Sequence, residues 1–423
     1  MIKVFNVVWG QIFVSVVSFV GLRIYTELLD RDAFGIGMLA IGILSLFDGM
    51  TVMAINQTLI ALCSRIEDGE PRRQLAVGLA AMASTACGVL VIPVTLGLVI
   101  VSIWWPTFRE FLWLPGCVAL YLGAEFIKSS LQSLLNLRAD YLRIAMWNAG
   151  EAAFGLLFTV VLLKFWDANW ISFLTGQLIS RVFSAAFFVL TFTGGAHLIG
   201  VTAAPARAAL GEALEFGTPV MAMAPLGWVS AFLDRFIIAS MLGTASTGTY
   251  VAATSLVGRP YALTTSVLTS YFRPQLFMAV GDEARRDRVT RLWLLSATGI
   301  GLLGAAGLMA LGDIITRFML AEPFRPGAVG LMVGVALAQT LSITTHGLDN
   351  TLLALGQSAA LLKIQSVLSV LTLAAIPIGV AWDGAFGAVA ARCFAEAVKL
   401  AGTWILTRHL TASAPINGGS KSD

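Results

Sequence analysis

The chain has 423 residues, of which 57% are hydrophobic and only 12% are charged, whereas soluble domains carry about 25% charged residues. This composition excludes an ordinary soluble protein and predicts an all-α polytopic membrane protein. The formal net charge of +3 gives no indication of a nucleic-acid partner, and we expect none.

Twelve apolar stretches are each long enough to cross a bilayer, which takes about 20 residues. In chain order they are residues 4–28, 34–62, 75–103, 112–135, 143–164, 171–190, 212–240, 246–272, 289–310, 327–354, 363–381 and 384–406. No short signal region precedes the first stretch, so we expect it to be a membrane helix. All connections between the stretches are short.

Lysine and arginine gather in alternate connections. One set of connections holds about three times as many of these cations as the other, and such an excess marks the cytoplasmic side. Tryptophans mark the opposite side, as an aromatic belt would. They are Trp104, Trp105, Trp166, Trp170 and Trp382. We therefore expect both termini in the cytoplasm.

Nothing in the sequence indicates an enzyme. The phosphate-binding pattern GxxxxGK[ST] is absent, and the short connections leave no room for a catalytic domain. The histidines, His197, His346 and His409, are too dispersed for a metal site. The four cysteines form no CxxC pair and predict neither a zinc site nor a disulfide framework. We expect no enzymatic activity and no cofactor.

The second half of the chain repeats the first. A shift of 213 residues brings Gly35 onto Gly248 and Arg72 onto Arg285. Further along, "GQLISRVF", which begins at Gly176, matches "GAVAARCF". The order of these matches predicts two homologous six-helix bundles.

The repeat sets the expected domain boundaries. We expect an N-terminal lobe over residues 1–205, a C-terminal lobe over 206–410 and a disordered cytoplasmic tail over 411–423. Two such halves, each with the same topology, are typical of transporters whose substrate site lies between the halves, near the bilayer midplane.

Three short segments of the second half are distinctive: "EFGTPVM" (Glu215–Met221), "DRFIIASMLG" (Asp234–Gly243) and "LGTASTGTY" (Leu242–Tyr250). They resemble motifs of the polysaccharide flippases of the MOP (multidrug/oligosaccharidyl-lipid/polysaccharide) superfamily. The first is similar to the motif that opens their seventh helix, and the other two resemble the run before the following outer turn and the turn itself. The first half departs from the pattern, because "LDRDAFGIG" (Leu29–Gly37) lacks the second glycine and the tyrosine.

The resemblance implies a V-shaped MOP/MATE-like architecture of twelve helices and a Wzx-type function. The cargo would be an oligosaccharide repeat unit on undecaprenyl diphosphate. It would cross the bacterial inner membrane by alternating access, for O-antigen or exopolysaccharide synthesis. Membrane lipid, a polysaccharide polymerase and a chain-length regulator would be its partners, and an H⁺ or Na⁺ gradient could supply energy. The alternative is a MATE-type cation-coupled multidrug antiporter, whose cavity would be acidic and aromatic.

Two charged residues are expected at similar depth on equivalent helices of the two halves. Arg259 lies about 16 Å from the Gly248 turn and Asp48 about 20 Å from the Gly35 turn, at 1.5 Å per residue. Ionisable residues inside a membrane are functional by default, so we assign both to the substrate site, with Arg259 meeting the diphosphate. The other interpretation is a structural ion pair between the halves.

Three further sets of charged residues are expected inside or near the membrane. Glu125 and Lys128 share a helix face and either line the cleft or satisfy each other. Arg23 lies near the outer end of the first helix, where it either snorkels to the interface or binds the diphosphate. Arg181 and Arg392 hold equivalent places in the last helix of each half, where we expect pairing within each bundle.

The remaining candidates concern ion coupling. Glu151 lies about 12 Å inside its helix from the cytoplasmic end and has no partner on that helix, which makes it a candidate proton site. His346, Asp349 and Asn350 lie at i, i+3 and i+4. They form either a proton or sodium relay or a hydrogen-bonded helix contact.

Overall fold

The computed structural model is helical over most of the residues that it describes. These are residues 2–63, 114–138, 140–193, 207–279 and 281–412, with scattered positions between 66 and 103. The predicted span 75–103 and the predicted tail lie largely outside this set, as do Trp104, Trp105 and Arg72.

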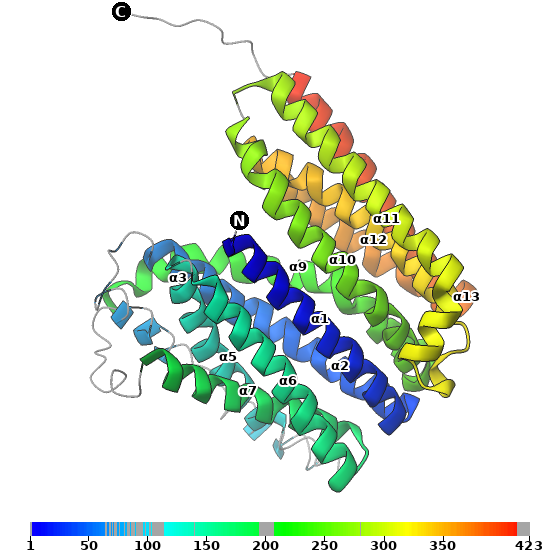
Figure 1. Cartoon of the computed structure of the whole chain (residues 1–423). Helices are drawn as coiled ribbons and strands as arrows, with labels where there is room; N and C mark the ends of the chain where they lie inside the picture. Colours follow the sequence, from blue (N-terminus) through cyan, green and yellow to red (C-terminus); the bar gives the residue numbers. More distant parts are fainter. Residues whose placement is uncertain are drawn as a thin grey trace, which may run out of the picture. The chain divides into compact units, whose positions relative to one another are not determined.

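Figure 1 shows the described helices in chain order, and the connections from α5 to α7 and from α9 to α13 are short. Their bounds are α1 Ile2–Leu28, α2 Arg31–Asp48, η1 Gly49–Met53, α3 Ala54–Cys63, α5 Leu114–Leu137, α6 Tyr141–Phe165, α7 Trp170–Thr193, α9 Leu210–Leu242, α10 Thr244–Met278, α11 Glu283–Met319, η3 Glu322–Phe324, α12 Ala328–Ala354 and α13 Ser358–Ala412. The predicted span 34–62 covers α2, η1 and α3 together, and every other predicted span apart from 75–103 coincides with one of these helices or with part of one.

Two of the helices are interrupted. The segment η1 is a π-helical turn that joins α2 directly to α3. Within α13, Asp383 and Gly384 leave the helical conformation, and Gly384 has a φ of 55°, which glycine adopts at little cost. This break separates the two spans predicted over 363–381 and 384–406.

Eight of the described helices are long and apolar enough to cross a membrane. The predicted all-α, multi-pass membrane fold is therefore confirmed, although the described residues do not establish a count of twelve. The helices α5 and α10 are not among the eight. Both carry polar side chains in their middle turns, and these include Glu125 and Lys128 on α5 and Arg259 on α10.

The chain divides into two compact units, Met1–Trp228 and Val229–Asp423. The division falls inside α9, later than the boundary at 205/206 that the repeat predicts. Contacts of the first half of α9 explain this position. The indole Nε1 of Trp228 donates to the carbonyl oxygen of Gly42 at 2.7 Å, so this part of α9 packs within unit 1.

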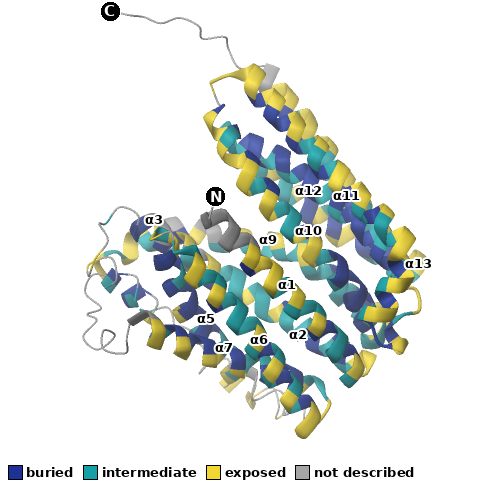
Figure 2. Cartoon of the chain, in the orientation of Figure 1, coloured by how far each residue is buried: buried dark blue, intermediate teal, exposed yellow. Residues whose placement is uncertain are grey.

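Each unit buries its own core. In unit 1, α6 packs against α1 and α7, and Trp147 stacks on Phe188 with ring centroids 4.1 Å apart. In unit 2, α12 packs against α10, α11 and α13, and Trp293 is fully buried. Exposed residues lie along the outward faces of helices such as α11 (Figure 2). Large apolar side chains on these faces suit contact with lipid rather than water.

The helix α11 provides a direct test of the predicted orientation. At 1.5 Å per residue, its 37 residues reach well beyond the hydrocarbon core, which is about 30 Å thick. We expect reporter fusions at Arg286, near its start, and at Glu322, just after its end, to report cytoplasm and periplasm respectively. A result that puts both reporters on the same side would contradict the topology.

Candidate functional site

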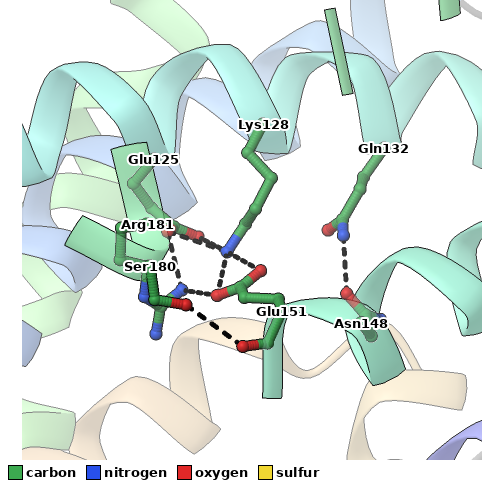
Figure 3. A network of polar contacts seen from close by, with 7 residues as sticks. All are labelled: Glu125, Lys128, Gln132, Asn148, Glu151, Ser180 and Arg181. Carbon is green, nitrogen blue, oxygen red and sulfur yellow. Dashed lines mark hydrogen bonds and ion pairs between the residues drawn. The ribbon is translucent and has the colours of Figure 1, made fainter. Parts of the chain in front are cut away.

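Four charged side chains meet in the interior of unit 1, and we call them the α5–α6–α7 cluster (Figure 3). It consists of Glu125 and Lys128 from α5, Glu151 from α6 and Arg181 from α7. The Nζ of Lys128 lies 2.6 Å from Glu125 Oε1 and 3.1 Å from Glu151 Oε2. The Nη1 of Arg181 lies 2.8 Å from Glu125 Oε2 and 2.6 Å from Glu151 Oε1. Each base therefore contacts both acids.

The helix geometry of α5 accounts for half of this arrangement. Glu125 and Lys128 are three residues apart and lie on one face, and that face packs against α7 and α6. The same seam continues one turn further, where Gln132 Nε2 donates to Asn148 Oδ1 at 2.7 Å (Figure 3). Polar contacts therefore follow the junction of α5 with α6 over successive turns.

Burial makes the charge balance of the cluster important. The side chains of Lys128, Glu125 and Glu151 are 7%, 10% and 13% exposed. A buried charge costs several kcal/mol unless an opposite charge and hydrogen bonds compensate it. Two acids and two bases, each shared, satisfy this condition. The second interpretation of Glu125 and Lys128, mutual satisfaction, is thus the one that their contacts favour.

Glu151 has partners that its own helix could not reveal. The sequence shows no base one turn away from Glu151 on α6, and for this reason it predicts a possible proton site there. Its partners Lys128 and Arg181 come from α5 and α7. Its backbone carbonyl also accepts from Ser180 Oγ at 3.2 Å. Whether Glu151 exchanges a proton stays a prediction.

A cavity of about 120 Å³ lies beside the cluster, between α2, α5 and α7. Most of its walls are apolar, and they include Leu44, Val118 and Leu178. Its polar lining includes Tyr121 and Arg181. The guanidinium carbon of Arg181 lies 5.4 Å from the centroid of the Tyr121 ring. Arg181 thus belongs to both the cavity and the ion pairs.

Asp48 lies next to this cluster, at the end of α2. It is within electrostatic reach of Glu125, Arg181 and Lys128. Its Oδ1 is buried and has no hydrogen-bond partner among the residues that the structure describes. The π-helical turn η1 begins at the next residue, Gly49.

A second polar centre occupies unit 2. Tyr250 on α10 donates its hydroxyl to Asp234 Oδ2 at 2.5 Å, and Arg392 Nη1 lies 3.1 Å from the same oxygen. Asp234 is only 3% exposed. Arg392 and Tyr250 therefore stabilise Asp234 in the interior of the unit. The expected pairing of Arg181 and Arg392 within their bundles is confirmed.

Two members of the predicted His346 cluster contact side chains on other helices. His346 Nε2 lies 3.1 Å from Thr269 Oγ1 on α10, and Asp349 Oδ2 lies 3.2 Å from Lys399 Nζ on α13. Asn350 bonds back to the carbonyl of His346 at 2.8 Å. These contacts favour a hydrogen-bonded helix contact, while a relay role stays a prediction.

Two candidate residues remain, and they differ in their contacts. Arg23 forms an ion pair with Glu27 on the same helix. Arg259 lies on α10 and is exposed. It has no acidic partner among the described residues. Because Asp48 belongs to unit 1 and Arg259 to unit 2, their predicted opposition across a cleft stays a prediction.

Comparison with known proteins identifies the family of this chain. The family model described as "Polysaccharide biosynthesis protein" matches residues 24–328, which is more than half of the chain. The chain belongs to this polysaccharide biosynthesis family. The motifs of the chain resemble those of MOP superfamily flippases, and the similar solved structures include members of that superfamily. No curated protein matches.

Solved structures show the fold of this family member. The chain is similar to a structure described as the lipid II flippase MurJ in an inward closed conformation. The TM-score is 0.76 at 13% identity, and the match covers 96% of this chain and 87% of that one. It is also similar to an inward-facing multidrug resistance MATE family transporter of the MOP superfamily, with a TM-score of 0.69 at 14% identity, covering 99% and 96%.

A third similar structure is a MOP superfamily transporter from Pyrococcus furiosus, whose title describes a reversed polarity of the binding pocket. The TM-score is 0.63 at 13% identity, and the match covers 97% of this chain and 95% of that one. The fold of this chain is thus similar to that of these solved transporters and flippase.

Two residues of the sequence motifs form a direct contact in this member of the polysaccharide biosynthesis family. The tyrosine of "LGTASTGTY" is Tyr250, and the aspartate of "DRFIIASMLG" is Asp234. They are joined by the 2.5 Å hydrogen bond. The sequence signal that could have found this pair was present, because a motif aspartate and a motif tyrosine stand on adjacent helices. Tyr121, by contrast, carries no sequence signal of its role beside Arg181.

Proposed function

We propose that this chain is a flippase for oligosaccharide repeat units linked to undecaprenyl diphosphate. The cargo crosses the bacterial inner membrane from the cytoplasmic side by alternating access, and it serves O-antigen or exopolysaccharide synthesis. The membership in a polysaccharide biosynthesis family supports this proposal. A polysaccharide polymerase and a chain-length regulator are the partners that such a pathway would supply.

Arg259 is the observation that carries the proposal. It sits near the middle of α10, a helix with a low mean hydropathy for a membrane span, and its side chain is exposed. The bases Lys128, Arg181 and Arg392 deep inside the two units are paired with acids. A cation that is held in the membrane without such a partner is available for an anion from outside the protein.

The chemistry of arginine fits a diphosphate. Its planar guanidinium donates two parallel hydrogen bonds to phosphate oxygens and stays charged at any relevant pH. Arg23 is the second candidate for the same group, although its pairing with Glu27 makes it less available. The polyprenyl tail would stay in the bilayer, and hydroxyl and amide groups would contact the sugar.

Substitution of Arg259 tests the proposal. We expect Arg259→Ala to abolish polymer export in cells that depend on this chain, because the cargo loses its anchor for phosphate. Arg259→Lys should retain partial export, since lysine keeps the charge but loses the fork. Polymer at the cell surface and protein abundance in the membrane are the two measurements.

A matched control uses a second exposed arginine. Arg291 lies toward the start of α11 and is exposed, so Arg291→Ala should leave export unchanged. Normal export by an Arg259→Ala variant that is present at wild-type abundance would end the hypothesis.

The second candidate is a cation-coupled multidrug antiporter, because the fold also matches MATE transporters. Such a protein would give cells resistance to cationic dyes and would not restore polymer export. Dye efflux from cells that express the chain, measured beside polymer export, separates the two functions. Efflux without any restored export would favour the antiporter.

A further inference from the structure

Five ionisable side chains lie together inside unit 1, and their formal charges do not cancel. The α5–α6–α7 cluster contributes two acids and two bases, which balance each other through the ion pairs described above. Asp48 is the fifth group. Its electrostatic neighbours are Glu125, Arg181 and Lys128, and Tyr121 on α5 also faces it. With Asp48 ionised, the group carries one net negative charge.

Within the described part of unit 1, the bases near Asp48 are Arg181 and Lys128. Both bases already serve two carboxylates each, and Asp48 Oδ1 is buried without a hydrogen-bond partner among the described residues. A lone carboxylate in a membrane interior is costly, and such groups are neutralised rather than left charged. Counted over the described residues, this site therefore lacks one positive charge.

The cavity beside the cluster provides a route for a small ion. Leu44 on α2 and Tyr121 on α5 line it. Asp48 and Glu125 come four residues later on the same two helices. They therefore lie on the same helix faces as Leu44 and Tyr121, one turn further along the chain from the cavity lining. The cavity volume of about 120 Å³ is ample for water, since about 10–15 Å³ of such space can hold one molecule. Water in this cavity would reach Arg181, which borders both the cavity and the ion pairs.

The backbone after Asp48 is also unusual. The π-helical turn Gly49–Met53 follows directly, and such turns occur mostly as single insertions at functional sites. The carbonyl of Phe47, just before Asp48, accepts a hydrogen bond from Thr51 Oγ1 at 2.6 Å. Binding of a proton needs one carboxylate oxygen alone, and Asp48 Oδ1 has no hydrogen-bond partner among the described residues.

We propose that Asp48 is a proton-binding site, reached through the cavity between α2, α5 and α7, that neutralises the buried charge of unit 1. The carboxylate takes a proton from cavity water and becomes a neutral acid, and it returns the proton to water on ionisation. No bond other than O–H forms or breaks, and no electron is transferred. The inference deepens the proposed transporter by naming its coupling group.

Infrared difference spectroscopy of the purified full chain tests this site without any cargo, so its failure is distinguishable from failure of the flippase proposal. A pH titration should reveal the carbonyl band of a protonated carboxylic acid. We expect Asp48→Asn to lose that band and Asp48→Glu to shift it. Asp313→Asn is the matched control, because Asp313 is exposed on α11 and outside the cluster, and it should leave the band unchanged.

Two further results decide the proposal. Asp48→Asn should fold at least as well as the parent in a thermal melt followed by size-exclusion chromatography, because it removes the unbalanced charge. Replacing potassium with sodium in the buffer should leave the titration unchanged. A band that persists in Asp48→Asn would overturn the proposal, and so would a titration that sodium suppresses, since the site would then hold a metal cation.

Discussion

Arg181→Gln is expected to remove most of the folded protein from the membrane. The guanidinium contacts Glu125 and Glu151 at once, and glutamine would leave Lys128 as the only base beside two buried acids. Removing one partner of a buried ion pair costs about 3–5 kcal/mol, because the remaining charge is uncompensated. Such a loss is comparable to the whole stability of many domains, which is about 5–15 kcal/mol. The measurement is the abundance of a fluorescent C-terminal fusion in membranes.

Three comparison variants isolate the cause. Arg259→Gln makes the same change at an exposed arginine and should leave abundance near the parent level. Arg181→Lys keeps the charge and should be intermediate. Arg181→Gln/Glu151→Gln removes one acid together with the base, and we expect it to recover part of the loss. Parent-level abundance of Arg181→Gln alone would show that the cluster contributes little to folding.

The last helix of each half shows which ion-pair contacts the internal repeat can predict. Matching Arg181 with Arg392 predicts that each pairs within its own bundle, and both do. The partners could not be predicted, because they differ between the units. Arg392 meets Asp234 on α9. A shift of 213 residues puts Gly21 at the equivalent place on α1, so unit 1 has no such aspartate.

Unit 1 compensates for the missing residues from other helices. Glu125 and Glu151 on α5 and α6 supply the acids for Arg181. The same shift puts Gly37 where unit 2 has Tyr250. A Cβ on Gly37 would lie 2.7 Å from the ring of Phe173, so a bulky aromatic residue from α7 packs against this position. The departure of the first half from the family motif is therefore a repacking of the same junction.

Hydropathy predicts well where the helices lie in the chain, but it predicts poorly which side chains of different helices contact one another. A run of about 20 apolar residues is sufficient to indicate a span, so the predicted stretches within the described residues coincide with helices. Contacts between helices depend on rotation about each axis and on depth. Single-helix spacing therefore found Glu125 with Lys128 but missed Glu151, whose partners lie on two other helices. The π-turn η1 left no pattern in the sequence.

Gly387→Ala is expected to prevent the last helix of unit 2 from packing, although it adds a single methyl group. The two parts of α13 on either side of the break at Gly384 touch through glycine backbones. A Cβ on Gly387 would lie 1.8 Å from the carbonyl oxygen of Gly379, and one on Gly379 would lie 2.2 Å from that of Gly387. Neither contact can be relieved by a side-chain rotation, so the segments must separate. Overpacking of this kind costs about 1–3 kcal/mol or more, and we expect the upper end.

The control substitution is expected to raise the stability of the protein, whereas Gly387→Ala lowers it. Gly402 lies further along the same helix with no atom within 4 Å of its added Cβ, and Gly→Ala in a helix interior otherwise stabilises by about 0.5–1 kcal/mol. Thermal melts of both variants, followed by size-exclusion chromatography, should therefore move in opposite directions. Gly176, the repeat partner of Gly387, extends the test, because its Cβ would lie 2.4 Å from Thr159 Cα. Gly176→Ala should lower the melting temperature as well, and tolerance of alanine at both glycines would contradict a shared close contact between neighbouring helices.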